Sequence, residues 1–181
     1  HNGIYGLATL NITSGRFNVF ELKHKAQVYA ELERLQAVEV LLSEDNPLHD
    51  ELNNTLSSNV SLRQQPPWWF DFDSANRLLN DQFGTKDLSG FGCDDLDCAI
   101  MAAGCLLQYT QDTQRAALPH ISGLHVENTD DVIVLDAASR RNLEIEINIS
   151  GGTENTLASV IDRTTTSMGS RCLRRWLQSP L

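Results

Sequence analysis

The spacing of apolar residues changes along the N-terminal part of the chain. In "IYGLATLNIT" apolar residues and glycine occupy alternate positions from Ile4 to Ile12, which predicts a strand with one buried face. The turn residues "SGR" follow and "FNVFEL" resumes the extended pattern, so we expect a hairpin. In "HKAQVYAELERLQ" the apolar spacing becomes three and four, which predicts a helix with one buried stripe. "AVEVLLSED" then predicts a strand, and this order favours a mixed α/β layer.

The middle of the chain predicts one more strand and two helices. Residues 43–60 are polar and predict a loop with one short helix, and "NVSLRQQ" predicts a strand closed by Pro-Pro. The next helix is expected to begin with Asp73 as its N-cap and to end at Gly84. "CDDLDCAIMAAGCLLQYTQDT" predicts a longer helix capped by Asp94. Its apolar stripe comprises Leu96, Ala99, Ile100, Ala103, Leu106, Leu107 and Thr110.

The C-terminal part begins after Pro119, which we take as the boundary marker. "LHVENTDDVIVLD" predicts two short extended pieces around a turn at residues 128–131. A helix is expected to start at Asp136 or Ser139 and to run through "RRNLEIEIN", and "TENTLASVID" predicts a shorter one.

The last helix, in "TSMGSRCLRRWLQSPL", has Thr166 or Ser167 as its predicted cap. Helical phase predicts an apolar face made of Met168, Cys172, Leu173, Trp176 and Leu177. It predicts a cationic face made of Arg171, Arg174 and Arg175. We expect the apolar face to pack onto residues 117–165, to lie against a second copy or to be partly disordered. An ordered helix with this face open to solvent would contradict the phase assignment.

Charge divides the chain unevenly. The net charge is −10, with 14 Lys and Arg against 24 Asp and Glu. The acidic excess lies in residues 1–139, which argues against a phosphate-binding surface spread over the chain and fits a protein-facing module. The four cysteines form no Cys-x-x-Cys pair and are expected to be reduced thiols. The sequence shows neither an export signal nor a membrane span, so we expect a cytoplasmic protein without a membrane partner.

Residues that could carry chemistry have simpler structural interpretations. "FGTKD" lacks the glycine spacing of a P-loop, and His120 with His125 is interpreted as two surface histidines. Trp68 and Trp69 are expected to anchor an aromatic cluster between layers, because the neighbouring charge is acidic and a stacking platform needs a basic groove.

The acidic residues gather at predicted helix starts. They are Asp71, Asp73, Asp94, Asp95 and Asp97. Aspartates at such positions stabilise a cap and the helix dipole without catalysis. A two-metal nuclease requires carboxylates converging from several elements. A metal-dependent nuclease that uses Asp71 or Asp73 remains the alternative.

Several longer blocks resemble a known family. They are "GLATLNITSGRF", "QFGTKDLSGFG", "AAGCLLQYTQDTQRAALPHI", "LDAASRRNLEI" and "GGTENTLASVIDRTTTSMGSRCLRRWLQSPL". Together they are similar to the MutS family of bacterial DNA mismatch repair proteins, from the connector domain (domain II) into the start of the core or lever domain (domain III). The resemblance covers nearly the whole chain, and residues 43–62 match least well.

The resemblance implies a fold and its division. Residues 1–116 are expected to form a connector with a ribonuclease-H-like mixed sheet and flanking helices, and residues 117–181 the first, mainly helical part of the core. Family members have an additional central strand before the one that begins here at Ile4. We therefore expect a compromised sheet or an edge that recruits a partner. That strand also carries the catalytic carboxylate in true nucleases of this fold.

The resemblance also implies a role. MutS dimers clamp DNA, detect mismatches with a Phe-x-Glu motif and hydrolyse ATP with magnesium, but this sequence has neither Phe-x-Glu nor a P-loop. We therefore expect no catalysis and no cofactor or metal site in this chain. The expected role is to couple mismatch binding to the ATPase state and to dock MutL. Other expected partners are further MutS domains, the second MutS subunit and mismatched DNA bound through other domains.

Helical phase, rather than the family, supplies the candidate contact residues. The candidates are chosen from the polar residues expected outside the apolar stripes of the two middle helices, and they are Asn76, Arg77, Gln108 and Asp112. A third hypothesis is direct DNA binding through the arginines of the last helix, which would weaken steeply with salt.

Overall fold

A computed structural model describes residues 3–56, 60–115, 118–127, 135 and 137–178. The first part contains β1 (Tyr5–Asn11), β2 (Arg16–Leu22), α1 (Lys25–Leu35), β3 (Glu39–Ser43), α2 (His49–Thr55), β4 (Ser61–Gln65) and the 3-10 helix η1 (Pro67–Phe70). It continues with α3 (Phe72–Phe83), the 3-10 helix η2 (Ser89–Phe91), α4 (Asp97–Gln114), β5 (His125–Val126), α5 (Ala137–Asn142), α6 (Leu157–Ile161) and α7 (Ser167–Gln178). The predicted mixed α/β class and the predicted hairpin are confirmed.

The chain divides into two compact units. Unit 1 comprises His1–Tyr29 and Gln36–Glu127, and unit 2 comprises Ala30–Leu35 and Asn128–Leu181. Helix α1 therefore contributes to both. The predicted domain boundary between residues 116 and 117 lies outside the described residues.

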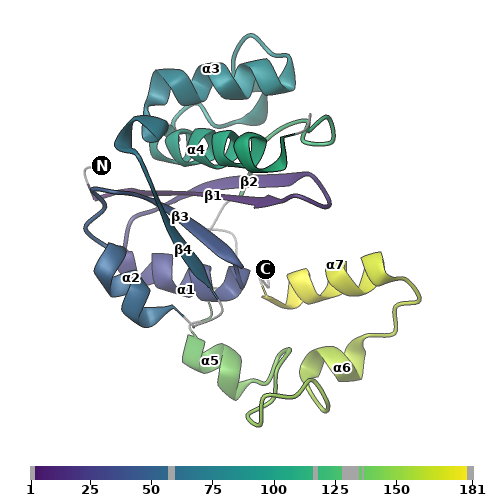
Figure 1. Ribbon diagram of the computed structural model, residues 1–181. Coiled ribbons are helices and arrows are strands. Elements are labelled where there is room, and N and C mark those ends of the chain that lie inside the picture. The colour runs from purple at the N-terminus through teal and green to yellow at the C-terminus, as the bar shows by residue number, and fades with distance from the viewer. Residues whose placement is uncertain (1–2, 57–59, 116–117, 128–134, 136, 179–181) are drawn as a thin grey trace. The chain divides into compact units, whose positions relative to one another are not determined.

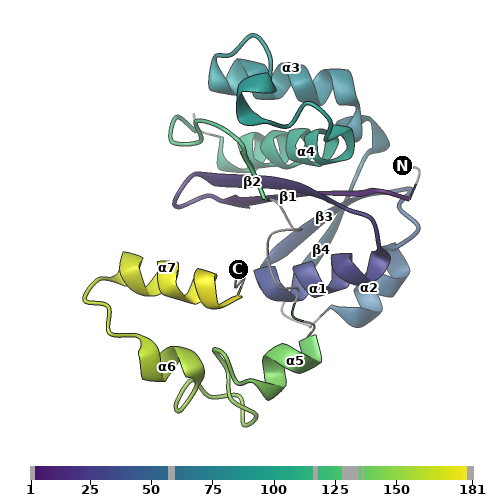
Figure 2. The same cartoon turned by 180° about the vertical axis from the view of Figure 1, so that it is seen from behind.

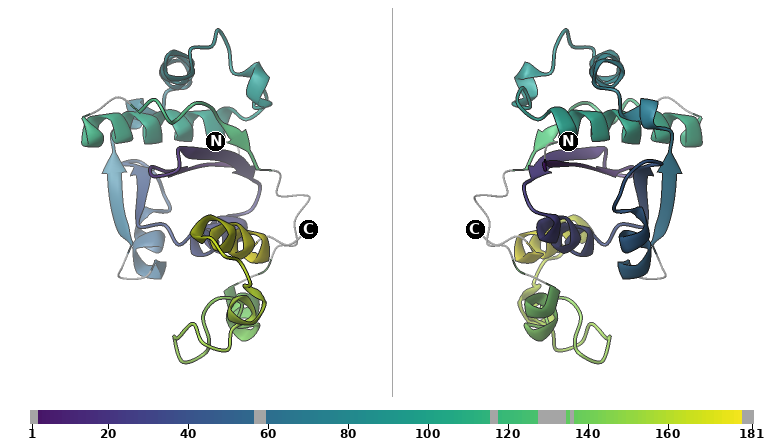
Figure 3. Two further views of the ribbon diagram at one scale, coloured as in Figure 1. Left: turned by 90° about the vertical axis from the view of Figure 1, so that its right-hand side faces the viewer. Right: turned by 90° about the vertical axis from the view of Figure 1, so that its left-hand side faces the viewer.

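The strands of unit 1 form two small sheets. β1 pairs antiparallel with β2, from Tyr5 opposite Leu22 to Asn11 opposite Arg16, and β5 pairs parallel with β2. β3 and β4 form a separate parallel pair, whose strands point in the same direction in Figure 3. Within the part of the chain that the structure describes, the strands do not join into one continuous sheet.

Two helices cover the β1–β2 hairpin in successive layers. α4 packs across β1, and α3 packs on α4 (Figures 1 and 2). A Cβ atom at Gly6 of β1 would lie 2.1 Å from the carbonyl carbon of Cys98, so the strand approaches the start of α4 more closely than a side chain permits. The apolar stripe predicted for α4 is confirmed, because Ala99, Ile100 and Leu107 are all buried.

The starts of both helices differ from the prediction. α3 has Asp71 as its N-cap, whose Oδ2 accepts a hydrogen bond from the Ser74 amide at 2.9 Å, so the expected cap at Asp73 is wrong. α4 begins at Asp97, after Leu96, and the expected cap at Asp94 is also wrong. A carboxylate from the hairpin takes the capping role instead, as described below. The predicted end of α3 at Gly84 is confirmed by its left-handed backbone, with φ at 67°.

The aromatic segment before α3 is only partly buried. η1 contacts α4, α3 and β3. Trp69 is half-buried, whereas Trp68 is 70% exposed, so the predicted anchoring role does not extend to Trp68. Nearby, Glu39 of β3 accepts hydrogen bonds from Arg63 of β4 at 2.7 Å and from the Tyr109 hydroxyl of α4 at 2.9 Å. These contacts join the parallel strand pair to α4.

Unit 2 is built from short helices and tight turns. α5 ends at Asn142, earlier than predicted, because Glu144 has a left-handed backbone with φ at 46° that cannot continue a helix. Thr156 caps α6 by accepting a hydrogen bond from the Ser159 amide at 3.2 Å. The predicted cap at Thr166 is confirmed, since its hydroxyl oxygen accepts from the Gly169 amide at 3.1 Å.

Candidate partner-binding site

Helices α3 and α4 pack closely against each other in unit 1. Ala75 and Leu79 of α3 are buried against α4. A Cβ atom at Gly104 would lie 2.2 Å from the Cβ of Ala75, which places the two backbones very close at this crossing. Gln111 of α4 also bonds to Gln82 of α3. Since both contacts advance by seven residues, or about two turns, the two helices run in the same direction.

The four predicted contact residues lie on these two helices. Arg77 and Asp112 are exposed, whereas Asn76 and Gln108 are half-buried. Asn76 Oδ1 accepts a hydrogen bond from the Asn80 amide group at 3.0 Å. Gln108 Nε2 donates to Asp112 Oδ1 at 3.2 Å. Each of these hydrogen bonds lies within one helix. The four residues therefore do not contact one another between the helices through these bonds, and the exposed Arg77 and Asp112 are accessible to a partner.

The outward face of α3 carries both signs of charge. Asp73, Arg77 and Asp81 are spaced four residues apart and all three are exposed, so they form one stripe on the helix. At the N-cap, hydrogen bonds from Ser74 lower the pKa of Asp71, and the nearby Arg77 charge lowers it further. An ionised cap beside an accessible arginine offers a partner both an acceptor and a cation.

Glu21 and Gln82 make long-range hydrogen bonds that the sequence pattern did not predict. Glu21 Oε1 on β2 accepts hydrogen bonds from the amides of Cys98 at 2.8 Å and Ala99 at 3.2 Å, and so caps α4. Gln82 shares the buried stripe of α3 with Leu79 and donates hydrogen bonds to backbone carbonyls beyond α4. A polar residue on an apolar stripe was a usable signal for Gln82, whereas the alternating pattern of β2 contains nothing that connects Glu21 to a helix.

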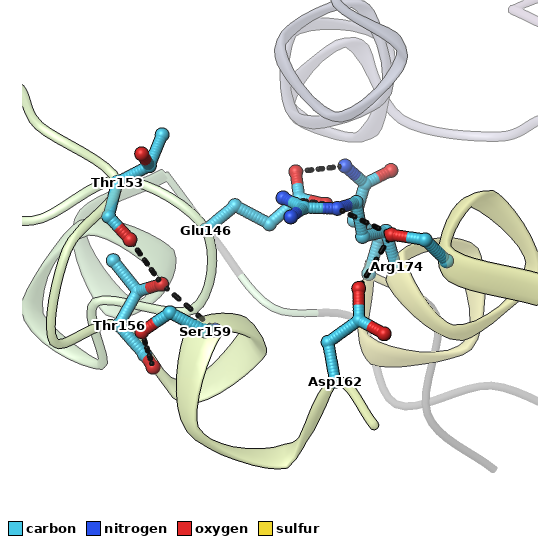
Figure 4. Close-up of polar contacts among 8 residues, drawn as sticks. Glu146, Thr153, Thr156, Ser159, Asp162 and Arg174 are labelled. Carbon is cyan, nitrogen blue, oxygen red and sulfur yellow. Dashed lines mark hydrogen bonds and ion pairs between the residues drawn. The ribbon is translucent and has the colours of Figure 1, made fainter. Parts of the chain in front are cut away.

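Unit 2 contains a polar network between α7 and the preceding turns (Figure 4). Asp162 accepts hydrogen bonds from the Ser170 hydroxyl at 2.5 Å and from the Thr164 hydroxyl at 2.6 Å, and these donors lower its pKa. Arg174 extends toward Ser170 and lies 4.0 Å from Glu146. Gln178 donates to the same Glu146 carboxylate at 2.6 Å. The network attaches α7 to the rest of the unit.

The faces predicted for α7 are wrong in part. Met168 and Trp176 are 79% and 64% exposed, whereas Leu173 and Leu177 of the same predicted face are half-buried. The hydrophobic pattern therefore predicted the half-burial of Cys172, Leu173 and Leu177 but not the exposure of Met168 and Trp176. Arg174 of the predicted cationic face is half-buried, with its Nε 3.5 Å from the Ser170 hydroxyl of the same helix and a guanidinium nitrogen 4.0 Å from Glu146. Arg171 and Arg175 are exposed whereas Arg174 is half-buried beside Glu146, which weakens the hypothesis of a three-arginine DNA contact.

The side chains that could bind a metal or react as thiols are separate from one another or buried in the described residues. No group of three or more His, Cys, Asp or Glu side chains that could hold a metal ion occurs among the described residues. The cysteines are free, as predicted, and burial raises the pKa of Cys105 to about 12, which keeps it a neutral thiol. No helix within the described ranges is long and apolar enough to cross a membrane.

Comparison with protein families identifies both parts of the chain. Residues 1–122 match the family model of MutS domain II, and residues 138–181 match that of MutS domain III. The first match contains the hairpin and the α3–α4 pair, and the second contains α6 and α7. The chain therefore belongs to the MutS family of DNA mismatch repair proteins and carries sequence of its domains II and III.

Proposed function

We propose that this chain is a non-catalytic coupling and docking module of mismatch repair. In this proposal unit 1 is a ribonuclease-H-like connector that joins mismatch binding to the ATPase state. The observation that carries the proposal is the occurrence of MutS domains II and III in one chain. Mismatched DNA, ATP and magnesium are bound by other domains, a second MutS subunit completes the assembly, and the protein acts in the cytoplasm.

The docking partner in this proposal is MutL, bound at the α3–α4 surface. The exposed side chains of Arg77 and Asp112 provide a cation and an anion on adjoining helices. Exposed charges of this kind steer association and set specificity. The close crossing at Gly104 holds α3 and α4 together, so both charges are presented by one packed pair of helices.

Retention of the N-terminal part of MutL by the immobilised chain at micromolar concentration tests this function. Arg77→Glu reverses an exposed charge on α3 and is expected to weaken retention by about tenfold, as for loss of one charged contact. Arg163→Glu makes the same change at an exposed position in unit 2 and serves as the matched control. Absence of retention by the unaltered chain would refute docking, and equal losses in both variants would refute the location.

The nuclease alternative predicts a different outcome. It requires cleavage of DNA or RNA with magnesium or manganese that Asp71→Asn or Asp73→Asn abolishes. Asp71 is engaged as the cap of α3 and Asp73 is exposed in its first turn. These positions favour the structural role of both aspartates, in agreement with the coupling proposal.

A further inference from the structure

The last segment of unit 1, residues 118–127, is attached to α3 through one amide side chain. Gln82 Nε2 donates hydrogen bonds to the carbonyl oxygens of Leu118 at 2.9 Å and Ile121 at 3.1 Å. Gln82 Oε1 accepts a hydrogen bond from Gln111 Nε2 at 3.1 Å. The two carbonyl acceptors and the one donor determine which way the amide points. Gln82 therefore joins α3, α4 and this segment in one connected network.

Other contacts attach the same segment to the hairpin. The ring Nε2 of His120 lies 2.7 Å from the carbonyl oxygen of Ile12 in the hairpin turn. Further along, β5 pairs with β2, and the Glu127 amide donates to the carbonyl oxygen of Val19 at 3.0 Å. Residues 118–127 thus lie between two anchors, the hairpin on one side and Gln82 of α3 on the other. Residue 128, which begins the second stretch of unit 2, follows directly.

Gln82 and the candidate docking residues share one rigid element. Arg77 precedes Gln82 by five residues, a rise of about 7.5 Å along α3. A helix moves as a unit, so a partner that displaces α3 at Arg77 also displaces the Gln82 amide. We propose that Gln82 is the positioning residue that transmits a shift of α3 to the segment entering unit 2. The identity of the partner that shifts α3 rests on the proposed function. The attachment of residues 118–127 to α3 rests only on the hydrogen bonds of Gln82.

Hydrogen–deuterium exchange of the whole chain tests the attachment. Gln82→Glu keeps the shape but removes both donors and turns a carboxylate oxygen toward two carbonyls, and Gln82→Met removes the polarity without adding charge. Both variants are expected to accelerate amide exchange in residues 118–127 by about ten- to hundredfold, the loss expected for two part-buried hydrogen bonds. Residues 103–107 of α4 should change by less than about twofold. Gln114→Glu adds the same charge at an exposed position of α4 and should leave both regions unchanged.

The outcomes separate attachment, transmission and docking. If exchange in residues 118–127 is unaltered in the Gln82 variants, the proposal is wrong. If exchange in residues 103–107 of α4 accelerates equally, Gln82 stabilises unit 1 as a whole and does not act as a positioning residue. With the N-terminal part of MutL added, the unaltered chain should change its exchange in residues 118–127, whereas Gln82→Glu should retain MutL without that change. If the unaltered chain fails to retain MutL, docking and transmission fall together, while the comparison without MutL still decides the attachment.

Discussion

The crossing of α3 and α4 at Gly104 gives a quantitative test of the packing. In an open helix, glycine to alanine stabilises by about 1 kcal/mol, because alanine has the better helix propensity. Here the added Cβ would lie 2.2 Å from the Cβ and 2.6 Å from the Cα of Ala75. Overpacking of this kind costs about 1–3 kcal/mol, and a clash with backbone belongs at the upper end. The two effects together predict that Gly104→Ala lowers the free energy of unfolding of unit 1 by about 2 kcal/mol.

Urea unfolding followed by tryptophan fluorescence measures this change. In a Trp176→Phe background the remaining tryptophans, Trp68 and Trp69, both lie in unit 1. A loss of about 2 kcal/mol corresponds to a midpoint lower by roughly 1 M urea, for a slope of about 2 kcal/mol/M. Gly90→Ala is the matched control, because nothing lies within 4 Å of its added Cβ, and its midpoint should hardly move.

The second half of the test removes the opposing atom. Ala75→Gly deletes the nearer clash, so the double variant with Gly104→Ala should recover part of the lost stability, with the remainder set by the contact to the Ala75 Cα. A Gly104→Ala protein that is more stable than the unaltered chain would refute the close crossing. Strictly additive effects in the double variant would refute the direct contact.

Three further predictions concern single side chains. Glu21→Ala removes the acceptor for two backbone amides of α4 and should lower the free energy of unfolding by about 1–2 kcal/mol in the same urea assay. Glu21→Gln keeps an acceptor oxygen and should lose less. Equal losses in the two variants would contradict a role for the charge of Glu21. At pH 8 iodoacetamide should modify Cys172 long before Cys105, whose pKa of about 12 and burial keep it a neutral thiol, and equal labelling rates by mass spectrometry would contradict this. Because the folded-state pKa of Asp162 is lowered, its stabilisation of the polar network is present above its ordinary value of 3.8 and is lost as the pH falls through the folded-state pKa. The amide resonance of Ser170 should therefore titrate in acid, and persistence of that titration in Asp162→Asn would contradict the assignment.

Local patterns predicted most of the elements correctly. The alternating residues of the hairpin, the stripe of α4, the stop at Gly84 and the cap at Thr166 depend on neighbours within a few residues in sequence. The family resemblance likewise depends on short sequence blocks, and the matches to MutS domains II and III confirm it. The sequence by itself therefore determined the mixed α/β class and the family.

The tertiary structure decided which polar groups meet across long sequence distances. The cap of α4 comes from Glu21, 77 residues before its first amide partner, and the acceptors of Gln82 lie 36 and 39 residues further along the chain. The contacts that attach α7 likewise join separated segments, because Ser170 donates to Asp162 and Gln178 donates to Glu146, 32 residues earlier. The periodicity of a sequence shows which face of an element is apolar. It does not show which distant residue will form the hydrogen bond that a buried amide or carbonyl needs. That choice exists only after distant segments have packed, because hydrogen bonds and ion pairs act over a few ångströms in space regardless of separation in sequence.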